Sequence, residues 1–366
     1  MIEFDTVALV LSGGNALGSY QAGAYQALEE YALEPGWVAA ASAGAVNGAI
    51  ICGSPVQRRL ARLEDFWQPA PAGTGESPWS RSAEDARRTA AASLTMATGR
   101  TGAFTPRRLW GPLWDPFVNP EPASLYDTTP LGATLERMVD FGLLNEGSTR
   151  LSVTAVDLES GGDVVFDTQS QALTIEHLRA SSALLPAFSP VEVEGRMLAD
   201  GGISANLPLD VVLRDPPPGR TLCIALDLLP QAASRPSGLG EAASRMQDLI
   251  FASQSRRAIA AWQAIFDARV ATDGGKEAQP AVTVLQIAYA DQGREVAGKA
   301  FDFSALSARA RWDAGHRDLG RALAQLEAGQ IDTDKPGLSV YRLNRAAPDD
   351  EPVLRLSHES LIKACG

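Results

Sequence analysis

The chain has 366 residues, of which 45% are hydrophobic and 21% charged, and this ordinary composition excludes a disordered or fibrous protein. A formal net charge of −12 argues against the basic face that a nucleic-acid partner would need. The three cysteines, Cys52, Cys223 and Cys365, lie far apart and lack the spacing of a disulfide framework or a cysteine zinc site, which suits a reducing compartment.

The N-terminus bears on where the protein is found. It is acidic and leads directly into a short apolar run, residues 6–11, without the basic and apolar regions of a signal peptide. The longest apolar stretch, residues 37–53, is too short and too interrupted to span a membrane. We therefore expect a cytoplasmic protein without a transmembrane segment, whose membrane contact, if any, is transient and peripheral.

The first fifty residues predict a β-α-β-α unit. Residues 6–11 are a β-branched apolar run typical of a buried strand, and a glycine-rich turn, residues 12–18, joins it to a helix over 20–31. A second strand is expected at 37–41 and a second helix at 44–52. This alternation predicts an α/β fold whose central sheet is mainly parallel and buried between helices.

The composition changes between residues 68 and 125, where Pro, Gly and aromatic residues accumulate. One helix is expected at 82–96, with Ser82 as its N-cap. An insertion of this length is typical of a lid or a binding loop, whereas its aromatic side chains would equally pin it to the body of the protein. The sequence slightly favours pinning. The aromatic residues concerned are Trp79, Phe104, Trp110, Trp114 and Phe117.

The remaining chain predicts further strands and helices in a mixed order. A hairpin is expected where residues 159–163 join two strands, and the later part should contain two long helices. We expect a catalytic domain at residues 1–230 that includes the insertion, with a C-terminal helical region and tail, 231–366, packed on it. The expected elements are helices at 130–141, 241–268 and 304–327 and strands at 150–157, 164–167, 221–228 and 281–289.

The glycine-rich turn is the first candidate functional segment. Gly13, Gly14 and Asn15 are small residues whose backbone N–H groups can converge at the start of a helix, where a phosphate or an oxyanion binds. A dinucleotide-binding turn is the alternative. However, Asn15 occupies its second glycine position and no acidic residue ends the next strand, so we favour the oxyanion site.

The second candidate segment is Ala40–Gly44, between the second strand and its helix. The pattern A-A-S-A-G resembles the nucleophile elbow G-x-S-x-G, in which a tight turn exposes a serine hydroxyl. Ala40 replaces the first glycine, and Gly44 retains the second. Alone, the pattern is equally compatible with Ser42 capping a buried helix.

The third candidate segment is Asp200, Gly201 and Gly202, which alone would indicate only a turn. All three segments follow strands, and sites gather at the carboxyl ends of the strands in parallel sheets. A right-handed crossover from residue 11 to residue 37 should also place the glycine-rich turn beside the serine. Together they predict a nucleophile, a base and oxyanion donors, which is what acyl transfer requires.

The histidines favour a dyad over a triad. A conventional triad needs a histidine on a loop after the acid. His316 lies inside a predicted helix, His358 lies in the tail, and His177 precedes Asp200. Direct use of Asp200 as the base is therefore simpler. The sequence offers no credible ligand cluster for a metal, and the chemistry needs no cofactor.

These motifs, G-G-N-A-L-G, A-x-S-x-G and D-G-G in that order, resemble the patatin-like phospholipase family. The resemblance implies a three-layer α/β/α fold and a Ser-Asp dyad, with Ser42 as nucleophile and Asp200 as base. It also implies that the backbone of Gly13, Gly14 and Asn15 forms the oxyanion hole. The supporting motif residues are Gly18, Ala40, Gly44, Gly201 and Gly202.

Longer stretches resemble a bacterial subgroup of that family with an extra C-terminal region. They are residues 16–28, 126–131 and 301–315. Leu17 departs from the family pattern, because many members carry Arg or Lys there. Together with Asn15 and Ala40, this departure bears on catalytic efficiency more than on reaction type.

The sequence therefore predicts a serine acyl hydrolase that cleaves lipid or other acyl esters through a covalent acyl-enzyme, without metal or cofactor. Two alternatives stay open. One is a catalytically silent lipid- or acyl-binding protein on the same fold, and the other is a Ser-His-Asp esterase.

Overall fold

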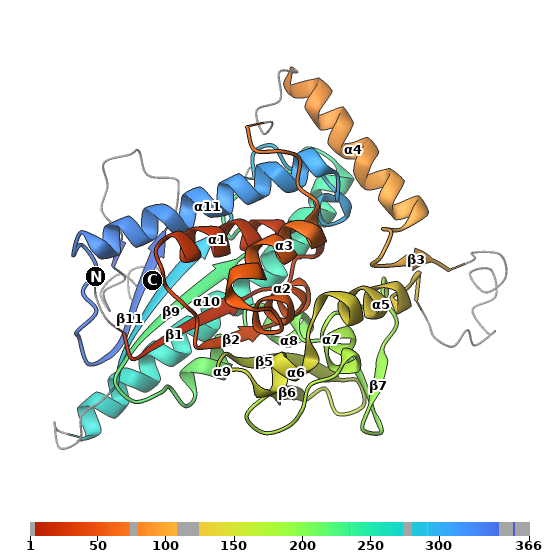
Figure 1. The fold of residues 1–366 in the computed structure, drawn as a ribbon. Helices are drawn as coiled ribbons and strands as arrows, with labels where there is room; N and C mark the ends of the chain where they lie inside the picture. Colours follow the sequence, from red (N-terminus) through yellow and green to blue (C-terminus); the bar gives the residue numbers. More distant parts are fainter. Residues whose placement is uncertain are drawn as a thin grey trace.

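The computed structural model describes most of the chain and contains a central sheet with helices on both faces (Figure 1). This arrangement confirms the predicted three-layer α/β/α fold with a mainly parallel sheet. The described residues are 4–73, 80–107, 124–233, 235–273, 280–290, 292–343 and 354–355.

The central sheet joins ten strands among the described residues. Their bounds are β1 Thr6–Leu11, β2 Trp37–Ala40, β5 Arg150–Asp157, β6 Asp163–Asp167, β7 Val191–Val193, β8 Arg196–Asp200, β9 Arg220–Asp227, β10 Ala281–Ala288, β11 Gly337–Leu343 and β12 Leu354–Arg355. The parallel core runs in the order β11-β10-β9-β1-β2-β5, and the other four strands pair antiparallel. A separate two-stranded ribbon pairs β3 (Thr105–Pro106) with β4 (Tyr126–Asp127).

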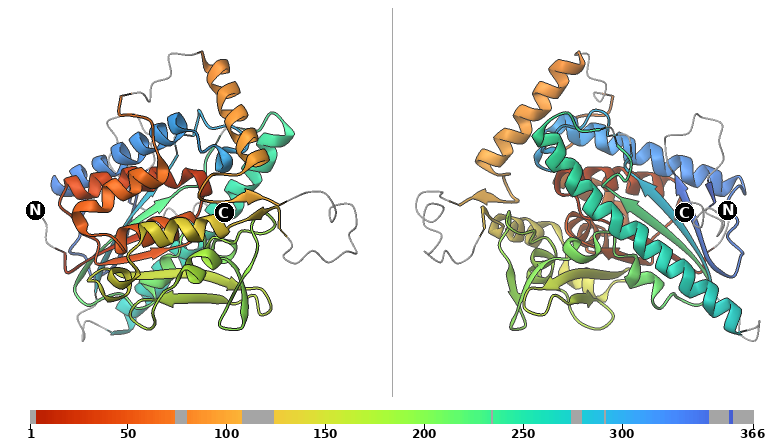
Figure 2. Two further views of the ribbon diagram at one scale, coloured as in Figure 1. Left: turned by 45° about the vertical axis from the view of Figure 1, so that its right-hand side comes forward. Right: turned by 180° about the vertical axis from the view of Figure 1, so that it is seen from behind.

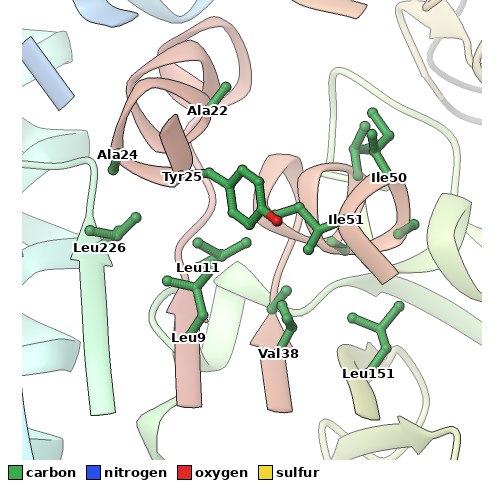
Figure 3. Packing of buried hydrophobic residues seen from close by; sticks show 14 of the residues in the cluster. Leu9, Leu11, Ala22, Ala24, Tyr25, Val38, Ile50, Ile51, Leu151 and Leu226 are labelled. Carbon is green, nitrogen blue, oxygen red and sulfur yellow. The ribbon is translucent and has the colours of Figure 1, made fainter. Parts of the chain in front are cut away.

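Successive side chains of the central strands point to opposite faces of the sheet, and both faces are covered, as a buried parallel sheet requires. On one face, Leu9 and Leu11 of β1 belong to the cluster that includes α1 (Ser19–Glu30), α2 (Ala43–Cys52) and α11 (Ala305–Glu327) (Figure 3). On the other face, Ala8 and Val10 pack with α9 (Leu209–Leu213) and α10 (Leu239–Asp273). Figure 2 shows α10 running across this opposite face of the sheet.

The remaining helices lie around this framework. One of them, α5, lies where the helix at 130–141 was expected. The bounds are η1 Asn15–Gly18, η2 Val56–Arg58, α3 Arg59–Trp67, α4 Arg81–Thr98, α5 Thr129–Met138, α6 Phe141–Glu146, α7 Ile175–Ser181, α8 Gly202–Ala205 and η4 Lys299–Phe301.

Helix α4 begins before its predicted start, so the assignment of Ser82 as N-cap is wrong. Ser80 is the cap: it has an extended backbone, and its side chain accepts a hydrogen bond from the Ala83 N–H at 3.4 Å. The insertion that carries α4 also carries Phe104, which is buried among other aromatic rings. The other four aromatic residues of the insertion named above lie outside the described residues.

Helices α1 and α11 pack with their backbones unusually close, because each has a glycine at the crossing. A Cβ atom on Gly315 would lie 1.9 Å from the Tyr20 carbonyl oxygen, and one on Gly23 would lie 1.9 Å from the Trp312 carbonyl oxygen. Backbone oxygens cannot rotate away as a side chain can. The crossing therefore tolerates no side chain at either position.

We expect Gly315→Ala to lower the free energy of unfolding by about 2–3 kcal/mol, because the two helices must move apart. Gly320→Ala, on the same helix with open space around it, is the control. It should raise the free energy of unfolding by up to about 1 kcal/mol through helix propensity. Urea denaturation of both variants measures the difference, and equal effects would contradict the close packing.

The described ranges contain no helix that is both long enough and apolar enough to cross a lipid bilayer.

Candidate active site

Strands β2 and β8 end opposite one another along the same edge of β5. Ala40, the last residue of β2, pairs with Val153, and Asp200, the last residue of β8, pairs with Ala155. Both pairings lie on one edge of β5, because β6 pairs along its other edge. Since β8 runs antiparallel to β5, the two strands point toward each other, which brings Asp200 to the level of Ser42.

This placement differs in one respect from the sequence-based expectation. The glycine-rich turn and the elbow do follow neighbouring parallel strands, β1 and β2. Asp200 instead ends an antiparallel strand and reaches the site from the opposite direction. It arrives at the same level because β5 continues past the end of β2 and offers β8 a free edge.

Ser42 sits in a strained backbone conformation at the turn between β2 and α2. Its φ of 55° and ψ of −125° are rarely adopted by residues other than glycine. Two serines hold this turn: the Ser42 N–H donates to the Ser181 carbonyl oxygen at 3.1 Å, and the Ser182 hydroxyl donates to the Ser42 carbonyl oxygen at 3.2 Å. A strained strand-to-helix turn is the hallmark of a nucleophile elbow.

Close packing explains why glycine follows Ser42 by two residues. A Cβ atom on Gly44 would lie 2.4 Å from the Leu11 carbonyl oxygen, so α2 can start against β1 only with glycine there. Ala40, which replaces the first glycine of the elbow, is fully buried at the end of β2. The other supporting glycines, Gly18, Gly201 and Gly202, also have a neighbouring atom less than 3.0 Å from where a Cβ would be.

Asp200 is buried and carries one hydrogen-bonded oxygen and one free oxygen. Asp200 is only 1% exposed to solvent. The Oδ1 atom accepts a hydrogen bond from the Gly202 N–H at 2.7 Å, whereas Oδ2 has no hydrogen-bond partner in the described chain. The Ser42 hydroxyl is near enough to influence the carboxyl group, although the two are not aligned in a regular hydrogen bond. Oδ2 is thus a free acceptor beside a hydroxyl donor.

Burial sets the proton affinity of this carboxyl group. Desolvation raises the pKa of Asp200 from its ordinary 3.8 to about 7, and the nearby Ser42 hydroxyl and the Gly202 N–H offset only part of the rise. A carboxylate with a pKa near neutrality is a much stronger base than an exposed aspartate. The site therefore has the base strength that the sequence alone could not supply.

The glycine-rich turn lies against Ser42. A Cβ atom on Gly13 would be 2.9 Å from the Ser42 Cβ. The Gly13 N–H, however, donates to the Asn206 carbonyl oxygen at 3.1 Å, so this predicted oxyanion donor is already bonded. We find no partner within the described residues for the N–H groups of Gly14 and Asn15. Of the three predicted donors, these two remain available.

Asn206 is a site residue that the sequence did not indicate. It is buried, its Nδ2 donates to the Gly13 carbonyl oxygen at 3.2 Å, and its own N–H donates to the Gln254 side chain at 2.8 Å. It thus ties the glycine-rich turn to the segment after Asp200 and to helix α10. An asparagine six residues beyond an aspartate carries no recognisable pattern, so only the fold reveals it.

A series of hydrogen bonds between buried polar side chains holds the other side of the glycine-rich turn. Gln21 donates to the Ser12 carbonyl oxygen at 2.8 Å, and Asn47 donates to Gln21 at 2.9 Å and to the Gly18 carbonyl oxygen at 3.0 Å. The Trp67 indole N–H completes the chain by donating to Asn47 at 2.8 Å. These side chains from α1, α2 and α3 fix the turn on the helices beneath it.

One pocket of about 480 Å³ contains these groups. Ser42, Asp200 and the three residues of the glycine-rich turn all line it. Most of its wall is apolar and comes from distant parts of the chain, including the insertion and helix α10. Its apolar and aromatic lining includes Val46, Trp67, Phe104, Leu131, Leu184, Phe188, Phe251, Phe301 and Phe303.

Neither histidine in the described residues lines this pocket. His177 is buried, packs against the Phe166 ring and accepts a hydrogen bond from the Thr174 N–H at 2.9 Å, which gives it a structural role. His316 lies 2.7 Å from Glu30 on the outside of α11. His358 lies outside the described residues. The described ranges also contain no group of acidic, histidine or cysteine side chains suited to hold a metal ion.

The chain matches two protein-family models. A family model described as patatin-like phospholipase matches residues 9–213, more than half of the chain. The chain belongs to the patatin-like phospholipase family. A second model, described as patatin phospholipase, matches residues 252–333, which agrees with the expected extra C-terminal region. Both matches confirm the family resemblance found in the sequence, and membership in a patatin-like phospholipase family implies a lipid hydrolase.

Other comparisons are more distant. No curated protein matches this patatin-like chain in sequence. Among solved structures, VipD from Legionella pneumophila is similar, with 14% sequence identity and a TM-score of 0.42. The similarity covers 87% of this chain and 67% of that one.

Proposed function

We propose that this chain is a serine acyl hydrolase that cleaves carboxylic esters of lipids, with Ser42 as nucleophile and Asp200 as general base. The opposed ends of β2 and β8 carry this proposal, because they hold a strained serine and a buried carboxylate in one apolar pocket. Nucleophilic catalysis needs a hydroxyl with a base within reach and donors for the developing charge.

The reaction has two steps. The Ser42 hydroxyl attacks the ester carbonyl carbon while Asp200 takes its proton, and the N–H groups of Gly14 and Asn15 bind the oxyanion of the tetrahedral intermediate. Protonated Asp200 then gives the proton to the departing alcohol, which leaves an acyl group on Ser42. In the second step Asp200 takes a proton from the water that attacks the acyl-enzyme and gives this proton to the departing Ser42 oxygen. The fatty acid is released, and both side chains return to their starting forms.

The wall of the pocket supports a fatty acyl substrate. Phe104 and Phe188 stack edge to face with centroids 5.2 Å apart, and Phe104 also meets Phe301 and Phe303 at 6.1 Å and 6.0 Å. These rings line the same pocket as Ser42. Burial of an acyl chain there contributes about 0.8 kcal/mol per methylene group. We therefore expect kcat/KM to rise with acyl length in a series of p-nitrophenyl esters.

The pH profile should report Asp200. Only its ionised form can accept the Ser42 proton, and burial raises its pKa to about 7. We expect kcat/KM for a neutral ester to rise tenfold per pH unit below this pKa and to level off above it. A profile that is flat between pH 5 and 8 would contradict Asp200 as the base.

Two measurements separate this function from its alternatives. A fluorophosphonate probe should attach covalently to Ser42, as peptide mass spectrometry would detect, whereas a silent lipid-binding protein would not react. Replacing His177, His316 and His358 one at a time by Ala should leave p-nitrophenyl ester hydrolysis within about threefold of wild type. A Ser-His-Asp esterase would instead lose about 10²-fold or more with one of them.

We further propose that the protein meets its substrate at a lipid surface, through the N-terminal half of α10. Leu239, Met246 and Ile250 are large apolar residues that are 92%, 61% and 50% exposed. They lie beside Ala243 and Phe251 on this helix, which line the pocket, so the exposed apolar face is continuous with the pocket mouth. Because the chain is acidic, neutral zwitterionic lipid suits this face better than anionic lipid.

Replacing Met246 and Ile250 by Ser should weaken binding to phosphatidylcholine vesicles several-fold, as co-sedimentation would measure. Ile265 and Val270 are the matched control, because they are 40% and 42% exposed on the same helix but lie about 30 Å further along it. Replacing these two by Ser should leave binding unchanged. If both double variants lost vesicle binding equally, the N-terminal half of α10 would not be the part that faces the lipid.

A further inference from the structure

Arg100 is a positively charged side chain in the wall of the pocket. It follows Gly99, the C-cap of α4, and opens a tight turn closed by two backbone hydrogen bonds to Phe104, of 2.9 Å and 3.1 Å. This turn directs Arg100 from the insertion back onto the body of the protein. The guanidinium is thus held at the pocket by a fixed segment of backbone.

Three aromatic rings surround the guanidinium. Its central carbon lies 4.6 Å from the Phe66 ring centroid, 5.4 Å from that of Trp67 and 4.4 Å from that of Phe303. One nitrogen donates to the Phe66 carbonyl oxygen at 2.5 Å. Cation–π contacts of this kind are attractive, because the negative face of each ring meets the positive charge. They orient the guanidinium, and within the described residues most of its five N–H donors have no acceptor.

The charge of Arg100 has no carboxylate partner in the described part of the chain. Two neighbouring cations, both buried, are neutralised: Lys299, which lines the same pocket, bonds Asp248 at 2.7 Å, and Arg311 bonds Glu295 at 2.8 Å. Burial lowers the pKa of Arg100 to about 10, so it remains charged at neutral pH. A cation without a counter-charge in an apolar wall destabilises the folded protein. The missing counter-charge points to a bound anion that neutralises the guanidinium.

Arg100 is connected to the glycine-rich turn through Trp67. The Trp67 ring packs against the glycine-rich turn, since a Cβ atom on Gly18 would lie 2.6 Å from Trp67 Cζ2. One aromatic ring therefore separates the guanidinium from the loop that would bind the oxyanion intermediate. A substrate whose ester lies at Ser42 can therefore place a second polar group beside the Arg100 guanidinium.

We propose that Arg100 is an anion-binding subsite of the pocket, which takes an oxyanion group that the ester substrate carries. The guanidinium fork matches two oxygens of a phosphate or a carboxylate. The proposal rests on the proposed function and narrows its substrates to esters with an anionic group. A phospholipid and an ester of a dicarboxylic acid both supply that chemistry, and the test distinguishes them.

Binding is measured in the Ser42→Ala background by titration calorimetry, so that hydrolysis plays no part. The probes are a short-chain dialkyl ether of glycerol phosphate, the same ether with a carboxylate in place of the phosphate, and the uncharged ether. We expect wild-type Arg100 to favour at least one anionic probe over the uncharged ether. Arg100→Met should reduce that preference about tenfold, and Arg100→Lys should retain part of it. The probe that loses affinity identifies phosphate or carboxylate.

Arg107→Met is the matched control. Arg107 belongs to the same insertion but bonds Ser124 and Ser189 and does not line the pocket. This variant should keep the full preference for the anionic probe. The subsite would be overturned if the protein with Arg100 bound all three probes equally well. It would also be overturned if Arg100→Met weakened all of them by the same factor, because Arg100 would then serve only to pack the aromatic wall.

Kinetics tests the same subsite in the active protein. The ratio of kcat/KM for an anionic ester to that for its uncharged analogue should fall about tenfold in Arg100→Met. If Ser42 failed to react with a fluorophosphonate and no ester were hydrolysed, the hydrolase function would be wrong, yet the binding ratios would still decide whether Arg100 holds an anion.

Discussion

Replacing Asp200 by Asn should lower kcat/KM for ester hydrolysis by about 10³-fold or more and at the same time stabilise the folded protein above pH 7. Activity falls because the amide cannot accept the Ser42 proton. The amide oxygen can still accept the Gly202 N–H, which Asp200 Oδ1 accepts at 2.7 Å. The variant should therefore fold, and Ser42→Ala should lose activity to a comparable degree.

The gain in stability follows from burial of the charge. The unfolded chain releases the Asp200 proton near its ordinary pKa of 3.8, whereas the folded chain holds it until about pH 7. Between these values the folded state binds more protons, so its stability declines as the pH rises, and above pH 7 the full cost of the buried charge is present. Removing that charge should raise the free energy of unfolding by roughly 2–4 kcal/mol at pH 8.5, and by less as the pH falls toward 4.

Asp227→Asn is the matched control. Asp227 ends β9, two strands from β2, is 3% exposed, and has a pKa raised by burial to about 6, but it does not line the pocket. Its replacement should shift stability in the same direction and leave ester hydrolysis within about threefold of wild type. If both variants lost activity, the loss would follow from removing any buried carboxylate, and it would not support Asp200 as the base.

The second large effect is expected at Arg311, which links the C-terminal region to the glycine-rich turn. Its side chain is fully buried. Nη1 donates to the Ala16 carbonyl oxygen at 3.1 Å and to the Asp302 carbonyl oxygen at 2.7 Å, while Nε and Nη2 each donate to Glu295 at 2.8 Å. Burial alone would raise the pKa of Glu295, but Arg311 and Arg88 outweigh it and hold that pKa at about 2.

We expect Arg311→Met to lower the free energy of unfolding by about 3–5 kcal/mol, because it leaves Glu295 buried with only Arg88 to neutralise it. The folded fraction should also lose activity, since the Ala16 carbonyl oxygen loses its donor and the turn is freed to move. Arg317→Met, on an exposed position of the same helix, should change stability by less than about 0.5 kcal/mol. Similar denaturation midpoints for both variants would contradict the structural role of Arg311.

The sequence predicted the parts of the site that depend on local backbone chemistry. A run of small residues after a strand indicated the glycine-rich turn, and a serine between alanines and a glycine indicated the elbow that Ser42 now shows with its positive φ. Period and composition were enough for β1, β2 and the helices that follow them. Each of these signals lies within ten residues of chain.

Features of the site that depend on the order of strands in the sheet could not be predicted from the sequence. The approach of Asp200 on an antiparallel strand requires knowing that β5 extends past β2 and leaves its edge to β8. The bonding of the Gly13 N–H depends on Asn206, which is 193 residues away. Arg311 resembles any other helical arginine until α11 is packed on α1. These contacts are fixed by tertiary pairing, which no local pattern encodes.

The rate at which a fluorophosphonate labels Ser42, measured against pH in wild type and in Asp200→Asn, tests the pairing of nucleophile and base most directly. It reports the reactivity of the hydroxyl itself, without acyl-enzyme hydrolysis or lipid binding. We predict that the wild-type rate rises with pH to a plateau, with a midpoint near 7, and that the variant labels at least 10²-fold more slowly on this plateau. The difference should shrink as the pH falls below 7, because wild-type Asp200 is then protonated. Labelling of Asp200→Asn at the wild-type rate would contradict the dyad.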